Sequence, residues 1–267
     1  MKKIAGPIIV VLGLIFVYAP ILILAVYSFT DATTIGAIRG FSLSNYITLF
    51  TTPELGSMIW GTVALALVSS VLATVLGTVG AIGSFYSGKR IGKMFGAANQ
   101  IPVVNADVVT AFSLCILLVV VLGVSKDTFI PLIIGHVVLS APFVYLSVTP
   151  KLKQMDSSLY EAALDLGASP AQALGKIIIP QIFSGIVSGF AMAITLSLDD
   201  YFIATYTKPA TFDTISTYVV NATRGSHTEI KTALWALSTV IFLIVLVVAI
   251  SMNLYRGKVK SEERSDA

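Results

Sequence analysis

Long apolar stretches that are nearly free of charged residues dominate the chain. No charge occurs in four of them, which lie between Lys3 and Asp31, Glu54 and Lys89, Asp127 and Lys151, and Lys231 and Arg256. Two further apolar stretches, 94–125 and 177–207, contain acids as their only charges. A helix needs roughly 20 mostly apolar residues to cross a bilayer. The pattern therefore predicts an all-α protein with six transmembrane helices, near 7–29, 58–86, 97–123, 128–149, 181–206 and 232–255.

Composition supports this interpretation and excludes several classes of protein. The 267 residues are 56% hydrophobic and 12% charged, with a mean hydropathy of +0.90. Soluble domains carry about 25% charged residues, so a soluble catalytic domain, a disordered chain and a disulfide scaffold are excluded. The single cysteine, Cys115, rules out an internal disulfide. We expect no cofactor and no metal site. We also expect no nucleic-acid partner, because in a membrane protein the distribution of positive charge matters more than the net charge, here +3.

The distribution of positive charge predicts the orientation. Six spans place both termini on one side, and the loops and tails of that side carry twelve Lys and Arg residues against five opposite. The positive-inside rule then places both termini in the cytoplasm of a multi-pass protein surrounded by membrane lipid. The first span is too long for a signal peptide and lacks a nearby cleavage site. We divide the chain into an N-terminal helix and external segment (1–56), a five-helix core (57–256) with a cytoplasmic loop (151–180), and a tail (257–267).

The first half of that loop has the pattern of a short helix. Ser158 and Glu161 fit a capping box, in which a hydroxyl is followed three residues later by a glutamate. Gly167 stands where a helix end favours a residue that tolerates positive φ. One apolar face is expected to hold Leu159, Ala162, Ala163 and Leu166.

A second short helix is predicted to follow. Ser169, Pro170 and Gln172 form a start signal, with a capping residue, a proline at the first helical position and a glutamine at the third. We expect this helix to end near Lys176 and Pro180 to begin the fifth span. On helix signals alone, the loop could simply link two spans.

The same loop resembles the EAA motif of the permease subunits of bacterial ABC importers. The family pattern is E-A-A-x3-G-x9-I-x-L-P, and this chain matches it except at Ile179, where Leu is usual; the matching residues are Glu161, Ala162, Ala163, Gly167, Ile177 and Pro180. The resemblance implies a type I ABC importer permease fold in the bacterial inner membrane. It also implies that Glu161, Ala162, Ala163, Gly167 and Ala168 form a coupling helix that docks on an ATP-binding subunit.

The resemblance further implies the partners and the substrate. Such a permease works with a second permease subunit, a dimer of ATP-binding subunits that hydrolyse ATP, and an external substrate-binding protein, so the chain itself is not an enzyme. More widely, the chain is similar to spermidine/putrescine permeases of the PotC type, in the segments 18–21, 41–46 and 197–200. Those permeases read Ser-Pro-Asp where this chain has Asn105-Ala106-Asp107. The implied external partner is therefore a polyamine-binding protein.

Three acids inside the predicted spans favour a cationic substrate. An acid at mid-membrane costs roughly 2.5–3.5 kcal/mol and usually faces a cavity or a partner. Asp107, Asp199 and Asp200 have no Lys or Arg in any predicted span to neutralise them. We therefore predict that they belong to the substrate path, together with Tyr201, whose ring could contact a cation.

Other roles for these residues remain open. Asp107 could cap a broken helix, Asp199 and Asp200 could sit in interfacial water, and one of that pair could meet the cation while the other caps a helix or contacts a partner chain. Tyr201 and Tyr145 could simply pack. His136 has no second His or Cys near it and is expected to be a hydrogen-bonded structural residue.

Three alternatives to a polyamine permease remain. The first is an importer permease for another small solute, and the second is a stand-alone secondary transporter, although no internal repeat is apparent. An intramembrane aspartyl protease would need Asp107 and one of the acidic pair at similar depth, whereas straight helices separate them by roughly 12 Å. The glycines of 77–83 and of 185–189 allow close helix contacts, either within the chain or with the partner permease.

Overall fold

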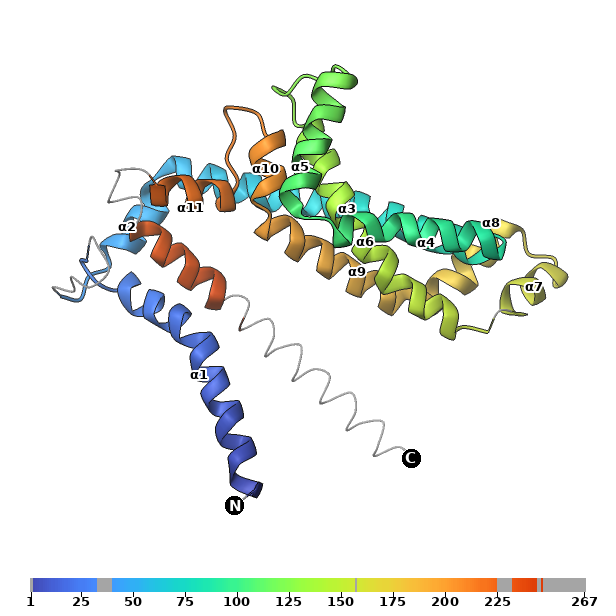
Figure 1. Ribbon diagram of the computed structural model, residues 1–267, viewed down its shortest axis with the longest axis horizontal. Helices are drawn as coiled ribbons and strands as arrows, with labels where there is room; N and C mark the ends of the chain where they lie inside the picture. Colours follow the sequence, from blue (N-terminus) through green and yellow to red (C-terminus); the bar gives the residue numbers. More distant parts are fainter. Residues whose placement is uncertain (1, 33–39, 157, 225–231, 244–245, 247–267) are drawn as a thin grey trace. The chain divides into compact units, whose positions relative to one another are not determined.

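The computed structural model describes residues 2–32, 40–156, 158–224, 232–243 and 246 (Figure 1). In this part of the chain, helices account for nearly all regular structure, and the β contacts amount to one bridge between Thr30 and Phe41. The helices are α1 (Lys2–Ser28), α2 (Ser44–Thr51), α3 (Pro53–Tyr86), α4 (Lys89–Val104), α5 (Asp107–Cys115), α6 (Ile130–Gln154), α7 (Ser158–Asp165), α8 (Pro170–Ala173), α9 (Ile179–Asp199), α10 (Phe202–Thr207) and α11 (Ile215–Arg224). Two π-helical segments, η1 (Ile116–Val121) and η2 (Leu174–Ile178), continue α5 and α8.

Within the described residues, four helices are long and apolar enough to cross a membrane. They are Ile9–Ser28 within α1, α3, α6 and the run Pro170–Asp199. The pair Lys89–Val104 and Asp107–Val121 makes a fifth candidate if the two count as one span. The sixth predicted span, 232–255, begins with the helix Thr232–Leu243 and then leaves the described residues. The all-helical class is confirmed, and the count of six spans stays a prediction.

The third predicted span is broken rather than straight. The helices on either side of the break, Lys89–Val104 and Asp107–Val121, are bent by 105° relative to each other. The bend arises because Asn105 and Ala106 have extended backbones (ψ 149° and 134°). The Asn105 side chain donates a hydrogen bond to Thr110 Oγ1 (3.0 Å), which stabilises the bend between α4 and α5. Asp107 then begins α5, where a negative charge is favourable at a helix N-terminus. A hydropathy pattern alone does not reveal a break of two residues such as Asn105 and Ala106.

The fifth predicted span begins earlier than expected. Helix α8, η2 and α9 run without interruption from Pro170 to Asp199, so the prediction of a separate helix ending near Lys176 is wrong. A proline ring inside a helix clashes with the carbonyl four residues earlier, which for Pro180 belongs to Lys176. The wider π-helical turn of η2 lies at this place and lets the helix pass the proline.

The chain divides into two compact units. The first holds Met1–Gly56 and Val219–Ala267. In it, the end of α1 is secured by Asn45, whose amide donates to the carbonyls of Ser28 (3.1 Å) and Thr30 (3.0 Å). The rings of Trp235 and Tyr27 pack edge to face with their centroids 5.6 Å apart, which joins the helix Thr232–Leu243 to α1. The segment around Asn45 therefore stabilises the end of the first span by hydrogen bonding.

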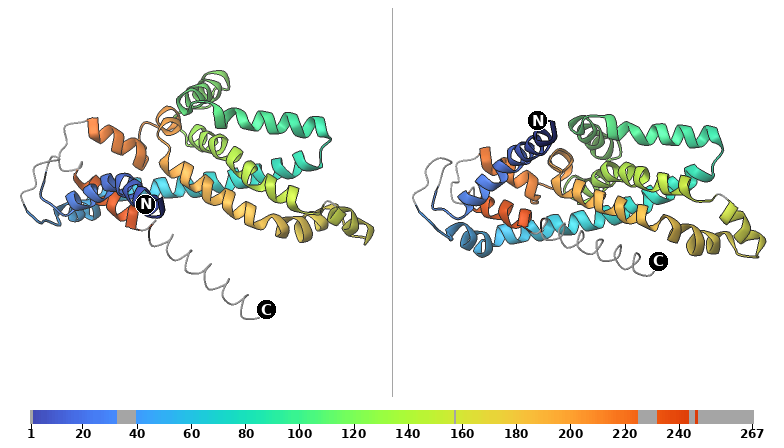
Figure 2. Two further views of the ribbon diagram at one scale, coloured as in Figure 1. Left: turned by 60° about the horizontal axis from the view of Figure 1, so that its bottom comes forward. Right: turned by 90° about the horizontal axis from the view of Figure 1, so that it is seen from below.

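The second unit, Ser57–Tyr218, is built around α6. Figure 2 shows α6 and α9 side by side, and this is the most extensive helix pair of the described chain. Glycines permit close approach to α6 from two helices: a Cβ at Gly189 of α9 would lie 3.0 Å from Val144 Cα, and one at Gly77 of α3 would lie 2.7 Å from the Ala141 carbonyl oxygen. Gly185 meets the Ser147 carbonyl oxygen in the same way, at 3.0 Å. These glycines serve packing within the chain.

Candidate functional site

The three acids predicted for a substrate path meet near the corner between α9 and α10. Helix α9 ends at Asp199, the backbone of Asp200 is extended, and α10 starts at Phe202. Asp107 begins α5, which packs against α10 (Figure 1). Both Asp107 and Asp199 lie close enough to Asp200 to act electrostatically on its carboxylate. The depth difference deduced for straight helices is therefore misleading, because the break before Asp107 brings α5 to this corner.

The neighbouring acids have opposite surroundings. Asp107 and Asp199 are exposed, and neither is paired with a Lys or Arg within the described residues. Asp200 is only 8% exposed. Its Oδ1 accepts a hydrogen bond from the Ile203 backbone N–H (3.2 Å), and its Oδ2 accepts one from the Ala204 backbone N–H (2.7 Å). Asp200 therefore caps α10, which is one of the roles left open for the pair.

A buried polar cluster supports that cap. His136 of α6 directs Nε2 toward Asp200 Oδ2 at 3.6 Å, and its Nδ1 lies 2.8 Å from Ser197 Oγ. Ser197 Oγ in turn lies 3.1 Å from Ser69 Oγ of α3. All four residues are buried. The structure confirms His136 as a hydrogen-bonded residue, and its contacts with Ser197 and Asp200 were not anticipated from the sequence.

The two tyrosines differ in their contacts. Tyr145 is buried, its hydroxyl lies 2.9 Å from Ser84 Oγ, and its ring lies 6.3 Å from that of Phe95. It packs inside the bundle. Tyr201 is half-buried between α9 and α10, with the ring of Phe202 edge-on at 5.3 Å. Tyr201 is therefore the one that adjoins the acidic corner.

Local signals in the cytoplasmic loop are largely reproduced. Gly167 has φ +86°, and the N–H groups of Gly167 and Ala168 bond to the carbonyls of Leu164 (2.9 Å) and Ala163 (3.0 Å). This is the Schellman pattern that ends a helix with a left-handed residue. Ser169 and Gln172 form the expected capping box, with Pro170 following the cap. The loop therefore turns at Gly167 between two helices, as predicted.

The start of α7 differs from the prediction. Ser158 is the first residue of the helix, and Asp156 provides the cap instead, accepting from the Ser158 backbone N–H (2.9 Å) and hydroxyl (2.8 Å) at Oδ1. These two hydrogen bonds lower the pKa of Asp156 below its ordinary value, because they favour the charged carboxylate. The cap is therefore fully formed at neutral pH.

Helix α7 is attached to the bundle on one face only. Ala163 is buried, and Tyr160 places its ring 5.0 Å from that of Tyr86 at the end of α3. Glu161 and Ala162 are exposed, and Leu166 is 90% exposed. The prediction of one shared apolar face is therefore wrong for Leu166, because the helix ends there and this side chain turns outward.

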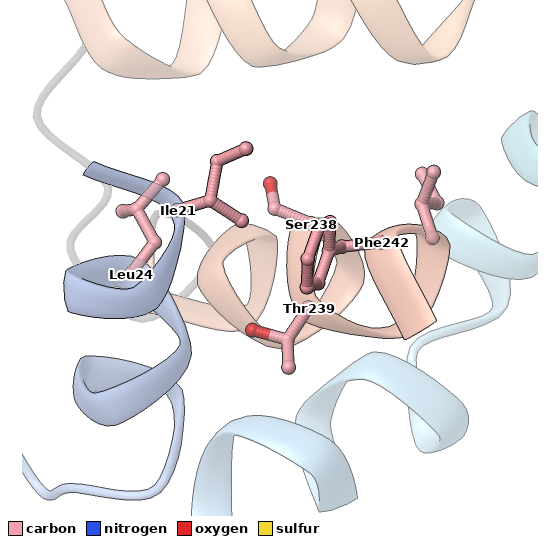
Figure 3. Close-up of a pocket in the computed structure, with 6 residues that line it drawn as sticks. Ile21, Leu24, Ser238, Thr239 and Phe242 are labelled. Carbon is pink, nitrogen blue, oxygen red and sulfur yellow. The ribbon is translucent and has the colours of Figure 1, made fainter. Parts of the chain in front are cut away.

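A hollow of about 370 Å³ in the first unit is a poor site for polar chemistry (Figure 3). It is lined by Ile21, Leu24, Ser238, Thr239, Ile241 and Phe242. The two hydroxyls donate to carbonyls of their own helix, Ser238 Oγ to Leu234 (2.9 Å) and Thr239 Oγ1 to Trp235 (2.9 Å). The hollow is thus effectively apolar.

Solved structures identify the class of fold. A bacterial ABC transporter involved in the import of the acidic polysaccharide alginate superimposes with a TM-score of 0.70 at 15% identity, covering 94% of this chain and 95% of that one. The MetNI methionine ABC transporter in inward-facing conformations gives 0.57 at 18% identity, covering 76% and 95%. The fold is that of the membrane subunits of ABC importers.

Sequence comparison then assigns the family. A family model for the binding-protein-dependent transport system inner membrane component matches residues 73–261. The putrescine transport system permease protein PotI of Escherichia coli (strain K12) is 32% identical over 240 residues, covering 88% of this chain and 84% of PotI. The spermidine/putrescine transport system permease protein PotC of Haemophilus influenzae is 30% identical over 234 residues, covering 88% and 90%. The chain belongs to the family of binding-protein-dependent transport system inner membrane components.

Family membership decides between the classes left open by the sequence. The chain is a multi-pass inner-membrane permease subunit of an ABC importer. It is a transport component rather than a protease or other enzyme, and it works with partner subunits of the kind that such importers use.

Proposed function

We propose that this permease subunit imports polyamines, and that Asp107, Asp199 and Tyr201 contact the passing cation. The observation that carries the proposal is the presence, beside the capping carboxylate of Asp200, of two exposed carboxylates that no Lys or Arg of the described residues pairs with. A polyamine would supply the positive charge that the predicted spans lack. The relatives PotI and PotC, which are named for putrescine and spermidine transport, support the same substrate class.

The acidic residues, rather than the fold, favour a cationic polyamine over an anionic substrate. A transporter with the same fold imports an acidic polysaccharide, so the fold is compatible with either sign of charge. Carboxylates that face a path repel an anion and attract a cation. An anionic substrate is therefore the less suitable candidate for this chain.

The cytoplasmic loop is the proposed contact with the ATP-binding subunit. Glu161 and Ala162 expose one side of α7, while Gly167 and Ala168 form the turn at its end. Leu166 adds an apolar side chain that is 90% exposed, and an exposed apolar residue beside small ones suits a protein partner. We assign docking on an ATP-binding subunit to this surface.

The proposed assembly contains this chain, a second permease subunit, two ATP-binding subunits and an external polyamine-binding protein. The positive-inside bias supports an orientation with both termini in the cytoplasm. In this orientation the loop 151–180 faces the ATP-binding subunits.

Uptake measurement with the full assembly tests the substrate. Radiolabelled putrescine and spermidine would be offered to proteoliposomes that contain the complex, ATP inside and the binding protein outside. We expect ATP-dependent accumulation that unlabelled polyamine abolishes and that sulfate and maltose leave unchanged. Accumulation of an anion or a sugar, with none of polyamine, would overturn the proposal.

A further inference from the structure

The buried polar cluster of Ser69, His136, Ser197 and Asp200 has no part in the proposed cation path. Its members come from α3, α6 and the end of α9, so that it links three helices of the second unit. A polar cluster inside a membrane-spanning bundle is costly unless its groups satisfy one another. Because its member Asp200 directly follows Asp199 in the chain, the cluster can influence the path without contact with the substrate.

We propose that His136 is a positioning residue that anchors Asp200 and thereby keeps Asp199 facing the cation path. This inference rests on the proposed function for the identity of the cation. The anchoring itself is a property of the corner and can be tested without any substrate.

The geometry of Asp200 explains the anchoring. Two backbone N–H groups hold its carboxylate by hydrogen bonds, and Nε2 of His136 lies 3.6 Å from Oδ2, close enough for an electrostatic contact. Because Asp199 is the adjacent residue and the last of α9, a rotation that released Asp200 would also turn Asp199 away from its present direction. The negative charges of Asp107 and Asp199 repel the Asp200 carboxylate. A donor on His136 Nε2 would oppose this repulsion and add to the two backbone hydrogen bonds.

The hydrogen-bond chain behind His136 keeps such a donor in both charge states of the ring. In the neutral ring with its hydrogen on Nε2, Nδ1 accepts from the Ser197 hydroxyl. In the cationic ring, Nδ1 donates to Ser197, Ser197 donates to Ser69, and Ser69 donates to the Leu65 carbonyl oxygen at 2.7 Å. In either arrangement Nε2 carries its hydrogen, and its nearest acidic oxygen is Asp200 Oδ2 at 3.6 Å, so that this contact is electrostatic and longer than a hydrogen bond.

Two substitutions separate the two ring nitrogens. In His136→Gln the side-chain amide nitrogen can reach the place of Nε2, so a donor toward Asp200 is kept. In His136→Asn the shorter amide reaches only the place of Nδ1, so the contact with Ser197 is kept and the anchor is lost. Ser140→Ala is the matched control, because Ser140 lies one turn further along α6, is buried, and its hydroxyl has no hydrogen-bond partner among the described residues.

Thiol reactivity at position 199 gives the substrate-free measurement. The variants are combined with Asp199→Cys and Cys115→Ala in the assembled complex, and the rate of modification by a cationic methanethiosulfonate reagent is recorded. We expect His136→Asn to slow the reaction by about tenfold, a typical size for coupling between neighbours in one network. His136→Gln and Ser140→Ala should leave the rate unchanged. Equal rates in all four backgrounds would overturn the positioning role.

Uptake kinetics separate positioning from simple loss of folded protein. In chains that keep Asp199, His136→Asn should raise the half-saturating spermidine concentration by about tenfold with little change in maximal rate per assembled complex. A fall in maximal rate alone would show that His136 only stabilises the fold.

A second variant covers the case in which His136→Asn does not assemble. His136→Leu removes the donor toward Asp200 while keeping an apolar side chain in the buried site, and it should slow modification of the thiol introduced at position 199; an unchanged rate in that variant also contradicts the proposal. If the wild-type complex transports no polyamine, the proposed function fails, whereas the thiol modification rates still decide whether His136 positions the corner.

Discussion

Asp199 and Asp200 are adjacent in the sequence, yet one is exposed and the other is buried. Successive residues of a helix point about 100° apart, so the two side chains could not both face the same cavity. The end of α9 increases this difference, because the backbone turns extended at Asp200 and its carboxylate folds back onto the first N–H groups of α10. One position therefore offers a charge to the surroundings, and the other uses its charge inside the protein.

Substitutions at the two positions should consequently have different effects, one on uptake and the other on stability. Asp199→Asn keeps the size of the side chain and removes the charge, so polyamine uptake should fall severely while the amount and melting temperature of the complex stay the same. Asp200→Ala removes the cap of α10, a loss that costs about 0.5–2 kcal/mol, and should lower the melting temperature of the purified complex. Radiolabelled uptake and thermal unfolding measure the two effects. Normal uptake by the double variant Asp199→Asn, Asp200→Asn would mean that both carboxylates are structural.

At the residue scale, the sequence can single out chemically unusual positions but not contacts between distant helices. The acids stand out in the sequence because the predicted spans hold no Lys or Arg. Ser69 and Ser197 give no such signal, since single serines are ordinary in apolar helices, and their contact depends on where α3 and α9 cross α6. Local sequence carries no information about that crossing.

At the scale of elements, the loop between α6 and α9 was predicted well because its signals are local. The turn at Gly167 and the capping box of Ser169 and Gln172 are fixed by residues within a few positions of one another. The continuous run through Pro180 was missed, and the break before Asp107 was only one of the alternatives left open. Both depend on how a helix accommodates a proline or a corner against its neighbours, which hydropathy does not report.

Gly167 offers a test of the coupling loop as an element. Its φ of +86° is strained for any L-residue by about 1–2 kcal/mol, and more for a β-branched one. Gly167→Val should therefore displace α7, so that the complex assembles in the membrane while substrate-stimulated ATP hydrolysis is lost. The matched control is Gly175→Val, because a side chain at Gly175 meets open space and needs no positive φ. Wild-type ATP hydrolysis and uptake in Gly167→Val would show that the loop has no docking role.

At the scale of the whole molecule, one helical run connects the two proposed functional regions. The residues from Pro170 to Asp199 begin beside the loop and end at the acidic corner, a length of about 45 Å for 30 residues at helical rise. The run packs along α6 through Gly185 and Gly189, which bring the two backbones into contact. A displacement of α7 can reach the α9–α10 corner through this rod, because closely packed helices shift as bodies instead of deforming continuously.

The orientation of that rod follows from the positive-inside bias and can be tested at the two ends of α6. Ser125 lies in the turn before α6, Gln154 is the last residue of the helix, and both are exposed. In a Cys115→Ala background, we expect Ser125→Cys to react with a membrane-impermeant maleimide added to whole cells and Gln154→Cys to react only after the cells are permeabilised. The charge count requires this result, since the side that includes Gln154 carries the larger number of Lys and Arg residues. Labelling of Gln154→Cys alone in intact cells would reverse the topology, place the loop 151–180 outside the cell, and remove it from any contact with an ATP-binding subunit.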